Sequence, residues 1–284
     1  MLEDKFVLSG FSDEISSDII TQFRELKKLG ISYFEPRGIN GKNISELTID
    51  EAKALKKQMD EFGIKASSIG SPIGKISVLD DFSEHLKKLS HVIEIAKILK
   101  TKYIRVFSFY IPEGDTPQKW RSTVMERMRK MAELAEKEGV ILLHENEHKI
   151  YGETAGLCKD ILEEVDSPAL GCVFDMGNFS FCGYEAYPKS FRELSEKITY
   201  LHIKDSLLDK TIVPPGMGKS SIKEILSELK KDDKKYFLSL EPHLAEFDGL
   251  KGLIDSINFR GDYKSGKDTF RLAYDCLQNI LKEI

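Results

Sequence analysis

The sequence predicts a (β/α)8 TIM barrel, an α/β fold in which eight parallel strands form the core and helices surround them. Eight short apolar segments alternate with longer segments whose apolar residues recur at helical spacing, and this alternation continues to the end of the 284-residue chain. Repeats of about 35 residues are typical of a closed barrel. An open doubly wound sheet has the same periodicity and is the alternative.

The expected strands are short, and apolar and polar residues do not alternate along them. They comprise residues 6–9, 32–35, 65–69, 103–107, 140–144, 170–174, 198–203 and 236–240. Uniformly apolar strands indicate burial on both faces, as a parallel sheet covered by helices requires.

Helices with one apolar face are expected between the strands. Their marker residues are Ile19, Phe23 and Leu26; Ala52, Leu55, Met59 and Phe62; Leu86, Leu89, Val92, Ile93 and Ala96; Val124, Met128, Met131 and Ala135; Ile222, Ile225, Leu226 and Leu229; and Phe270, Ala273, Leu277 and Ile280. Gly63 and Gly139 follow two of these helices, and glycine tolerates the left-handed conformation that ends a helix. His85 and His91 are expected on an exposed helix face.

Residues 245–267 are the longest irregular stretch and a candidate lid or binding loop.

The bulk composition predicts a single cytoplasmic domain that spans residues 1–284. No Pro-, Gly- or Ser-rich linker divides the chain, and 41% hydrophobic residues suffice for a sizeable core. A net charge of −5 argues against nucleic-acid binding, which needs a broad basic surface. The sequence contains no run of 18 or more apolar residues, so no membrane span is expected. Its first residues lack the basic segment followed by an apolar one that is typical of a signal peptide. The four scattered cysteines are expected to be reduced core thiols, and a homodimer is possible.

Four successive strands end in residues that can bind a metal ion. Glu145, Asp175 and Glu241 follow buried runs, and His202 lies within the seventh strand. The carboxyl ends of barrel strands converge on one mouth, where a buried carboxylate is costly unless a cation neutralises it. Singly, each residue has an ordinary role as a helix cap, a salt-bridge partner or a core histidine. Together they predict a site for a divalent metal ion, Mn²⁺, Co²⁺, Mg²⁺ or Zn²⁺.

Other polar residues near the strand ends are candidate substrate contacts. Glu35, Arg37, Lys75 and Arg105 either contact the substrate or form salt bridges with one another. Lys204, Asp205 and His243 complete the predicted substrate-binding set, although Lys204 and Asp205 could instead support His202. Residues 214–220 could bind a phosphate through backbone amides, or form a plain turn in which Ser220 caps the next helix.

Four segments of the sequence resemble the sugar phosphate isomerase/epimerase superfamily, the xylose-isomerase-like barrels. They are GVILLHEN (139–146), FDMGNF (174–179), HIKD (202–205) and LSLEPH (238–243). The resemblance covers nearly the whole chain, and it implies that Glu145, Asp175, His202 and Glu241 are the metal ligands. Many members carry a histidine three residues after the aspartate, where this chain has Asn178. That difference favours one metal ion over a multi-zinc cluster.

The resemblance implies a metal-dependent isomerase or epimerase that acts on a sugar or sugar phosphate by proton transfer. In this interpretation Glu145 and Glu241 are the catalytic acid and base. A metal-assisted hydride shift would use the same ligands. The alternatives are an inosose-dehydratase-type lyase and a non-catalytic sugar-binding barrel. The superfamily also contains apurinic endonucleases, but the acidic net charge and Asn178 argue against that activity.

Overall fold

Six of the expected strands form one parallel sheet in the computed structural model, which describes residues 5–246, 258–259 and 265–284. In spatial order they are β1 (Phe6–Gly10), β12 (Tyr236–Leu240), β9 (Ile198–Ile203), β8 (Leu170–Asp175), β7 (Ile141–Glu145) and β6 (Tyr103–Val106). The first and the last of these strands along the chain, β1 and β12, are neighbours and pair in parallel. The two edges of this sheet are therefore β1 and β6.

Two short strands, β2 (Tyr33–Phe34) and β5 (Lys65–Ala66), pair with each other and complete the ring. Glu35 N–H donates to the carbonyl of Gly10 at 2.9 Å and links β2 to β1, while Ile69 N–H donates to Tyr103 O at 2.9 Å and links the β5 segment to β6. The barrel prediction is confirmed, and the open sheet is wrong. β2 is shorter than expected because Pro36 follows Glu35 directly and has no N–H to extend the ladder.

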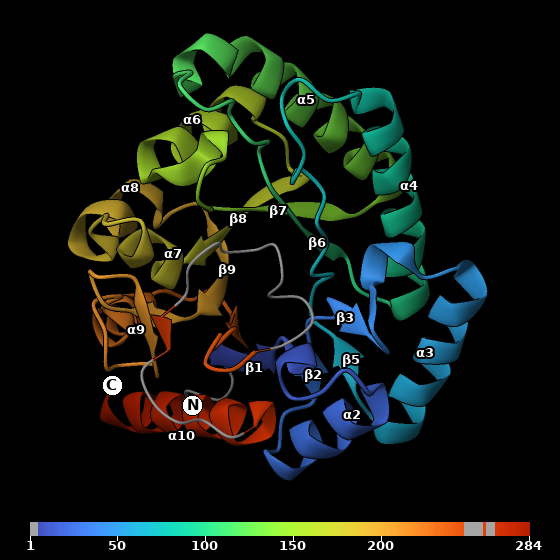
Figure 1. Ribbon diagram of the computed structural model, residues 1–284, viewed down its shortest axis with the longest axis vertical. Coiled ribbons are helices and arrows are strands. Elements are labelled where there is room, and N and C mark those ends of the chain that lie inside the picture. The colour runs from blue at the N-terminus through green and yellow to red at the C-terminus, as the bar shows by residue number, and fades with distance from the viewer. Residues whose placement is uncertain (1–4, 247–257, 260–264) are drawn as a thin grey trace.

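Helices surround the strands, as Figure 1 shows in a view down the barrel. They are α2 (Ile19–Lys28), α3 (Ile49–Phe62), α4 (Phe82–Leu99), α5 (Pro117–Glu138), α6 (Ala155–Val165), α7 (Met176–Phe181), α8 (Phe191–Leu194), α9 (Ile222–Leu229) and α10 (Gly266–Glu283). Gly63 and Gly139 adopt left-handed conformations at the ends of α3 and α5, with φ of 64° and 73°, as expected. None of the helices within the described residues is both long and apolar enough to cross a bilayer.

Small sheets lie outside the ring. β3 (Gly38–Ile39) and β4 (Lys42–Asn43) form a hairpin, and β10 (Asp205–Ser206), β11 (Thr211–Val213) and β13 (Asn258–Phe259) form a second unit. Most of the candidate lid, namely residues 247–257 and 260–264, lies outside the described residues.

Packing corrects the expectation that two histidines of α4 are exposed. His85 is buried, and its Nε2 accepts a hydrogen bond from Gly74 N–H at 2.7 Å. His91 is half-buried, with Nε2 2.8 Å from the carbonyl of Leu47. Each ring meets a backbone group of a loop, and such a group needs a hydrogen-bond partner when it is buried. Burial lowers the pKa of His85 to about 4, so the ring is the neutral acceptor that Gly74 requires.

The cysteines are free thiols, but only two of them are buried in the core. Cys158 and Cys172 are buried, as expected, and their pKa values are raised by burial. Cys182 and Cys276 are half-buried, so the expectation of core thiols is wrong for them.

Candidate metal centre and active site

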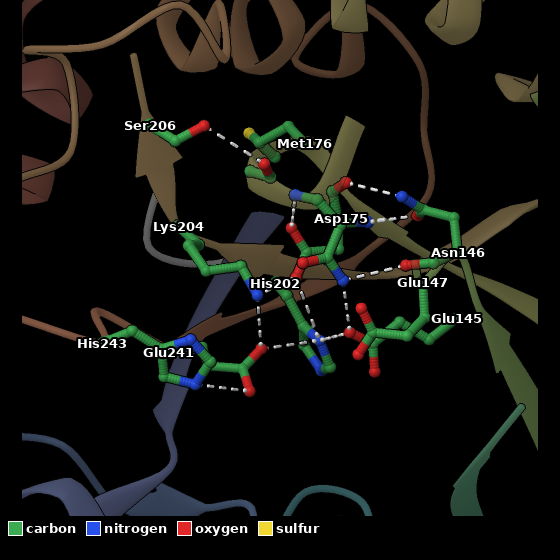
Figure 2. A network of polar contacts seen from close by, with 12 residues as sticks. Glu145, Asn146, Glu147, Asp175, Met176, His202, Lys204, Ser206, Glu241 and His243 are labelled. Atoms are coloured by element: carbon green, nitrogen blue, oxygen red, sulfur yellow. Dashed lines mark hydrogen bonds and ion pairs between the residues drawn. The ribbon is translucent and has the colours of Figure 1, made fainter. Parts of the chain in front are cut away.

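The ends of four neighbouring strands bring Glu145, Asp175, His202 and Glu241 together. Glu145 ends β7, Asp175 ends β8, His202 lies in β9, and Glu241 follows β12. One ligand atom from each of the four lies within 4.8 Å of the others, and all four side chains are buried. Figure 2 shows the side chains pointing toward one another. This is the arrangement that a common metal ion requires.

His202 lies between the carboxylates. Its Nδ1 is 3.3 Å from Glu145 Oε1, 3.4 Å from Glu241 Oε2 and 3.9 Å from Asp175 Oδ2. On the other side of the ring, Nε2 lies 3.2 Å from Glu35 Oε2. With Nε2–H as donor to Glu35, the Nδ1 lone pair faces the carboxylates, and such a partner commonly orients a metal-binding histidine.

The donor set fits a divalent ion. Glu145 Oε2, Asp175 Oδ2, His202 Nδ1 and Glu241 Oε2 are buried and form no hydrogen bond within the described part of the chain. Buried polar atoms without hydrogen bonds are costly and uncommon. Three carboxylate oxygens and one imidazole nitrogen suit Mn²⁺, Mg²⁺, Co²⁺ or Zn²⁺.

The charges of the cluster depend strongly on one another. Burial alone would lower the pKa of His202, but Glu145 and Glu35 outweigh burial and raise that pKa to about 10. Burial would raise the pKa of Glu145, but His202 and Arg105 lower it to about 2. For Asp175 burial prevails over Lys204 and raises the pKa to about 7. A metal ion bound through His202 Nδ1 would therefore displace a proton.

Two buried cations flank the carboxylates. Lys204 Nζ lies 3.0 Å from Asp175 Oδ2 and 3.6 Å from Glu241 Oε2. Arg105 Nη1 lies 3.3 Å from Glu145 Oε2. Burial opposes the charge of Lys204, but Asp175 and Glu241 hold its pKa above the usual range, so the ammonium stays protonated.

Arg37 pairs with three carboxylates. Its Nε donates to Asp13 Oδ2 at 2.8 Å, Nη1 to Glu241 Oε1 at 2.8 Å and Nη2 to Glu14 Oε1 at 3.2 Å. His243 adds to the same group, because its Nε2 lies 3.3 Å from Glu241 Oε1. Burial, opposed by Arg37, raises the pKa of Glu14 to about 8. Arg37 thus positions Glu241 through a salt bridge.

A cavity at this mouth is lined by most of the predicted residues. The lining residues are Arg37, Lys75, Arg105, Glu145, Glu147, Asn178, Lys204, Glu241 and His243. Four predicted residues do not line it, namely Glu35, Asp175, His202 and Asp205. Glu35 lies behind His202.

Glu147 and Asn178 also line this cavity, although the sequence did not single them out as site residues. Glu147 Oε2 accepts from Lys75 Nζ at 2.9 Å, and Asn178 Nδ2 donates to Glu145 Oε1 at 3.2 Å. Asn178 N–H also donates to Asp175 Oδ1 at 2.7 Å. The signal for Asn178 was its place three residues after Asp175, where a helix-capping carboxylate receives a backbone N–H.

Asp205 holds the loop that follows β9. Its Oδ1 accepts from Ser206 and Ser220 N–H at 2.9 and 3.0 Å, and its Oδ2 accepts from Gly216 and Gly218 N–H, both at 2.9 Å. The amides that could have bound a phosphate are therefore occupied by this carboxylate. The capping prediction for Ser220 is also wrong, because Ser221 is the N-cap residue of α9.

Comparison with solved structures finds the same fold over nearly the whole chain. The L-ribulose 3-epimerase structure is 18% identical, with a TM-score of 0.75 over 97% of this chain and 94% of that one. The IOLI protein with a bound zinc atom is 17% identical, with a TM-score of 0.75 over 97% and 98% of the two chains. The probable 3-DHS dehydratase AsbF from Bacillus anthracis is 21% identical, with a TM-score of 0.73 over 96% and 98%.

Sequence comparison gives the family. Among curated proteins, none matches this chain significantly. A family model described as xylose isomerase-like TIM barrel matches residues 23–261, which include all four residues of the cluster. The chain belongs to the xylose isomerase-like TIM barrel family.

Proposed function

We propose that this protein is a divalent-metal-dependent isomerase or epimerase that acts on a sugar or sugar phosphate by proton transfer. The observation that carries the proposal is the buried cluster of Glu145, Asp175, His202 and Glu241. Two of its members, Glu145 and Glu241, line one cavity together with the cations Lys204 and Arg105. Family membership and the named epimerase among the structural neighbours support it.

The four residues of the cluster would hold the metal ion. When bound, the ion supplies Lewis-acid polarisation of a substrate carbonyl, which makes the adjacent C–H more acidic. Glu35 keeps the imidazole of His202 in place, and Arg37 does the same for the carboxylate of Glu241.

Glu145 and Glu241 are the proposed acid and base. Each has one oxygen tied to a neighbour, Glu145 Oε1 to Asn178 and Glu241 Oε1 to Arg37, whereas each Oε2 forms no hydrogen bond in the described residues. The surrounding cations hold both pKa values below the usual range despite burial, so both carboxylates are ionised and able to accept a proton. One takes a proton from the substrate, and the other, after taking up a proton from solvent, returns it to the opposite face.

The cations of the cavity would bind and stabilise substrate oxygens. Lys204 Nζ and Arg105 Nη1 lie next to the carboxylates, where negative charge would develop on the substrate oxygen. Lys75 and His243, which line the same cavity, are the proposed outer contacts.

The test is turnover of a sugar panel by the purified protein loaded with Mn²⁺. The panel contains ketoses, including L-ribulose, together with aldoses and inososes. In ordinary water we expect an isomer or epimer with the same mass as the substrate. In heavy water the product should carry one deuterium from the solvent. A product lighter by one water would replace the proposal with a lyase. Isomerisation without solvent label would indicate a hydride shift, and binding without turnover would indicate a non-catalytic barrel.

A further inference from the structure

A second group of metal-ligating side chains lies outside the buried cluster. His148 follows β7, Glu153 ends the 3-10 helix η3 (Tyr151–Glu153), and Cys182 directly follows α7. One ligand atom from each of the three lies within 4.8 Å of the other two. We propose that His148, Glu153 and Cys182 form a second divalent metal site that takes a zinc-type ion.

The separations suit tetrahedral coordination. His148 Nδ1 lies 3.0 Å from Glu153 Oε2 and 3.7 Å from Cys182 Sγ. Zinc bonds of about 2.0–2.1 Å to nitrogen or oxygen and about 2.3 Å to sulfur place tetrahedral ligand atoms roughly 3.3–3.6 Å apart. An ion therefore fits after shifts of a few tenths of an ångström.

Neighbouring groups orient Glu153. Tyr184 Oη–H donates to Glu153 Oε1 at 2.8 Å, and Lys149 N–H donates to Oε2 at 2.6 Å. Hydrogen bonds of this kind commonly fix metal-binding carboxylates.

The second site differs from the buried cluster in chemistry and in access. The two sites share no residue, and a thiolate ligand selects Zn²⁺ or Co²⁺ over Mg²⁺ or Mn²⁺. The side chain of His148 is 41% exposed, so an ion can enter from solvent. On binding, the Cys182 thiol would release its proton to solvent. Three protein ligands leave a fourth position for water or a ligand oxygen.

Both sites follow the same strands. His148 lies three residues beyond Glu145, and Cys182 lies seven residues beyond Asp175. The second ion would therefore sit at the same end of the barrel as the buried cluster. The inference does not depend on the proposed reaction, since it concerns metal binding alone.

Cobalt distinguishes the two sites by spectroscopy. The full-length protein is stripped with a chelator and titrated with Co²⁺. We expect two equivalents to bind, one of them giving the near-ultraviolet charge-transfer band of a cobalt–thiolate bond. Cys182→Ser should lose that band and one equivalent, whereas Asp175→Asn should lose the other equivalent and keep the band.

Two further variants sharpen the assignment. Cys276→Ser alters the other half-buried cysteine, on α10, and should keep the band and both equivalents. Tyr184→Phe leaves all three ligands in place and should weaken Co²⁺ binding at the thiolate site by about 10- to 100-fold. A parent protein without the band, or a Cys182→Ser variant that retains it, would overturn the proposal. If Cys276→Ser abolished the band, the thiolate ligand would be Cys276 in place of Cys182, and this too would overturn the proposal.

Discussion

Glu35 Oε2 lies 3.2 Å from Nε2 of His202. Glu35 directly follows β2 and His202 lies in β9, and these two strands are separated in the ring by β1 and β12. Both side chains are fully buried. The contact joins the two-stranded part of the barrel, β2 and β5, to the six-stranded sheet that carries the proposed metal ligands. It also determines which imidazole nitrogen faces Glu145, Asp175 and Glu241.

Removal of Glu35 should therefore weaken metal binding without removing a ligand. Glu35→Gln should lower metal affinity by about 10- to 100-fold, because the imidazole loses the charged partner that orients it and increases its basicity. Competition with a chromophoric chelator measures this change. Glu61→Gln, on the exposed surface of α3, is the matched control. Equal affinity of the Glu35 variant and the parent would show that the contact does not support the site.

Replacement of either proposed acid or base should stop turnover. Glu145→Gln and Glu241→Gln each lose a carboxylate that can carry a proton, and general acid–base catalysis is worth about 10²- to 10⁴-fold. Steady-state rates on the sugar found in the panel measure the loss, with metal content checked by elemental analysis. Glu113→Gln, an exposed residue between β6 and α5, is the control. Activity within about tenfold of the parent would remove that glutamate from the catalytic role.

Asp205 should matter for stability through the loop it holds. Asp205→Asn has one acceptor oxygen in place of two, so some of the N–H groups of Ser206, Gly216, Gly218 and Ser220 lose their partner. We expect the free energy of unfolding to fall by about 2–4 kcal/mol, as for buried hydrogen bonds to a charged group. Urea unfolding measures it, with the exposed Asp233→Asn as control. If the free energy of unfolding fell no more than in the Asp233→Asn control, Asp205 would not stabilise the loop as proposed.

His85 should make stability depend on pH. Burial lowers its pKa from 6.5 to about 4, so below 6.5 the unfolded chain binds a proton that the folded chain does not. The neutral His85 ring contributes fully to the free energy of unfolding above pH 6.5. This contribution is lost as the pH falls toward 4, with a slope of up to about 1.4 kcal/mol per pH unit.

His85→Gln can still accept from Gly74 N–H but does not titrate. Its urea midpoint should therefore fall less steeply than that of the parent over this acidic range. His144 and His243, whose pKa values burial also lowers to about 4, are present in both proteins and cancel in the difference. Parallel curves for the variant and the parent would contradict the prediction.

The sequence predicted the positions of site residues wherever barrel topology alone determines them. Glu145, Asp175 and Glu241 end strands or directly follow them, and the ends of parallel strands must meet at one mouth whatever the side chains do. The helices α7 and α8 gave no comparable signal because they contain only six and four residues. A segment that short shows no helical period.

Side-chain direction was beyond the sequence. Asp205 lies three residues after His202 and looked equally available to a substrate, but its carboxylate turns to the backbone of a loop up to 15 residues away. Arg37 lines the cavity, and its pairing with three carboxylates was likewise not evident from the sequence. Such choices depend on which partners the folded chain brings within reach, and residue order does not encode them locally.

The carboxylate of Asp205 also bears on substrate choice. Barrel enzymes often bind phosphate through loop amides near strands seven and eight. In this protein the amides of Gly216 and Gly218 at that place already donate to the carboxylate of Asp205. A phosphoryl ester would have to displace Asp205 or be repelled by it. Free sugars should therefore be turned over in preference to their esters, and added inorganic phosphate should not compete with them.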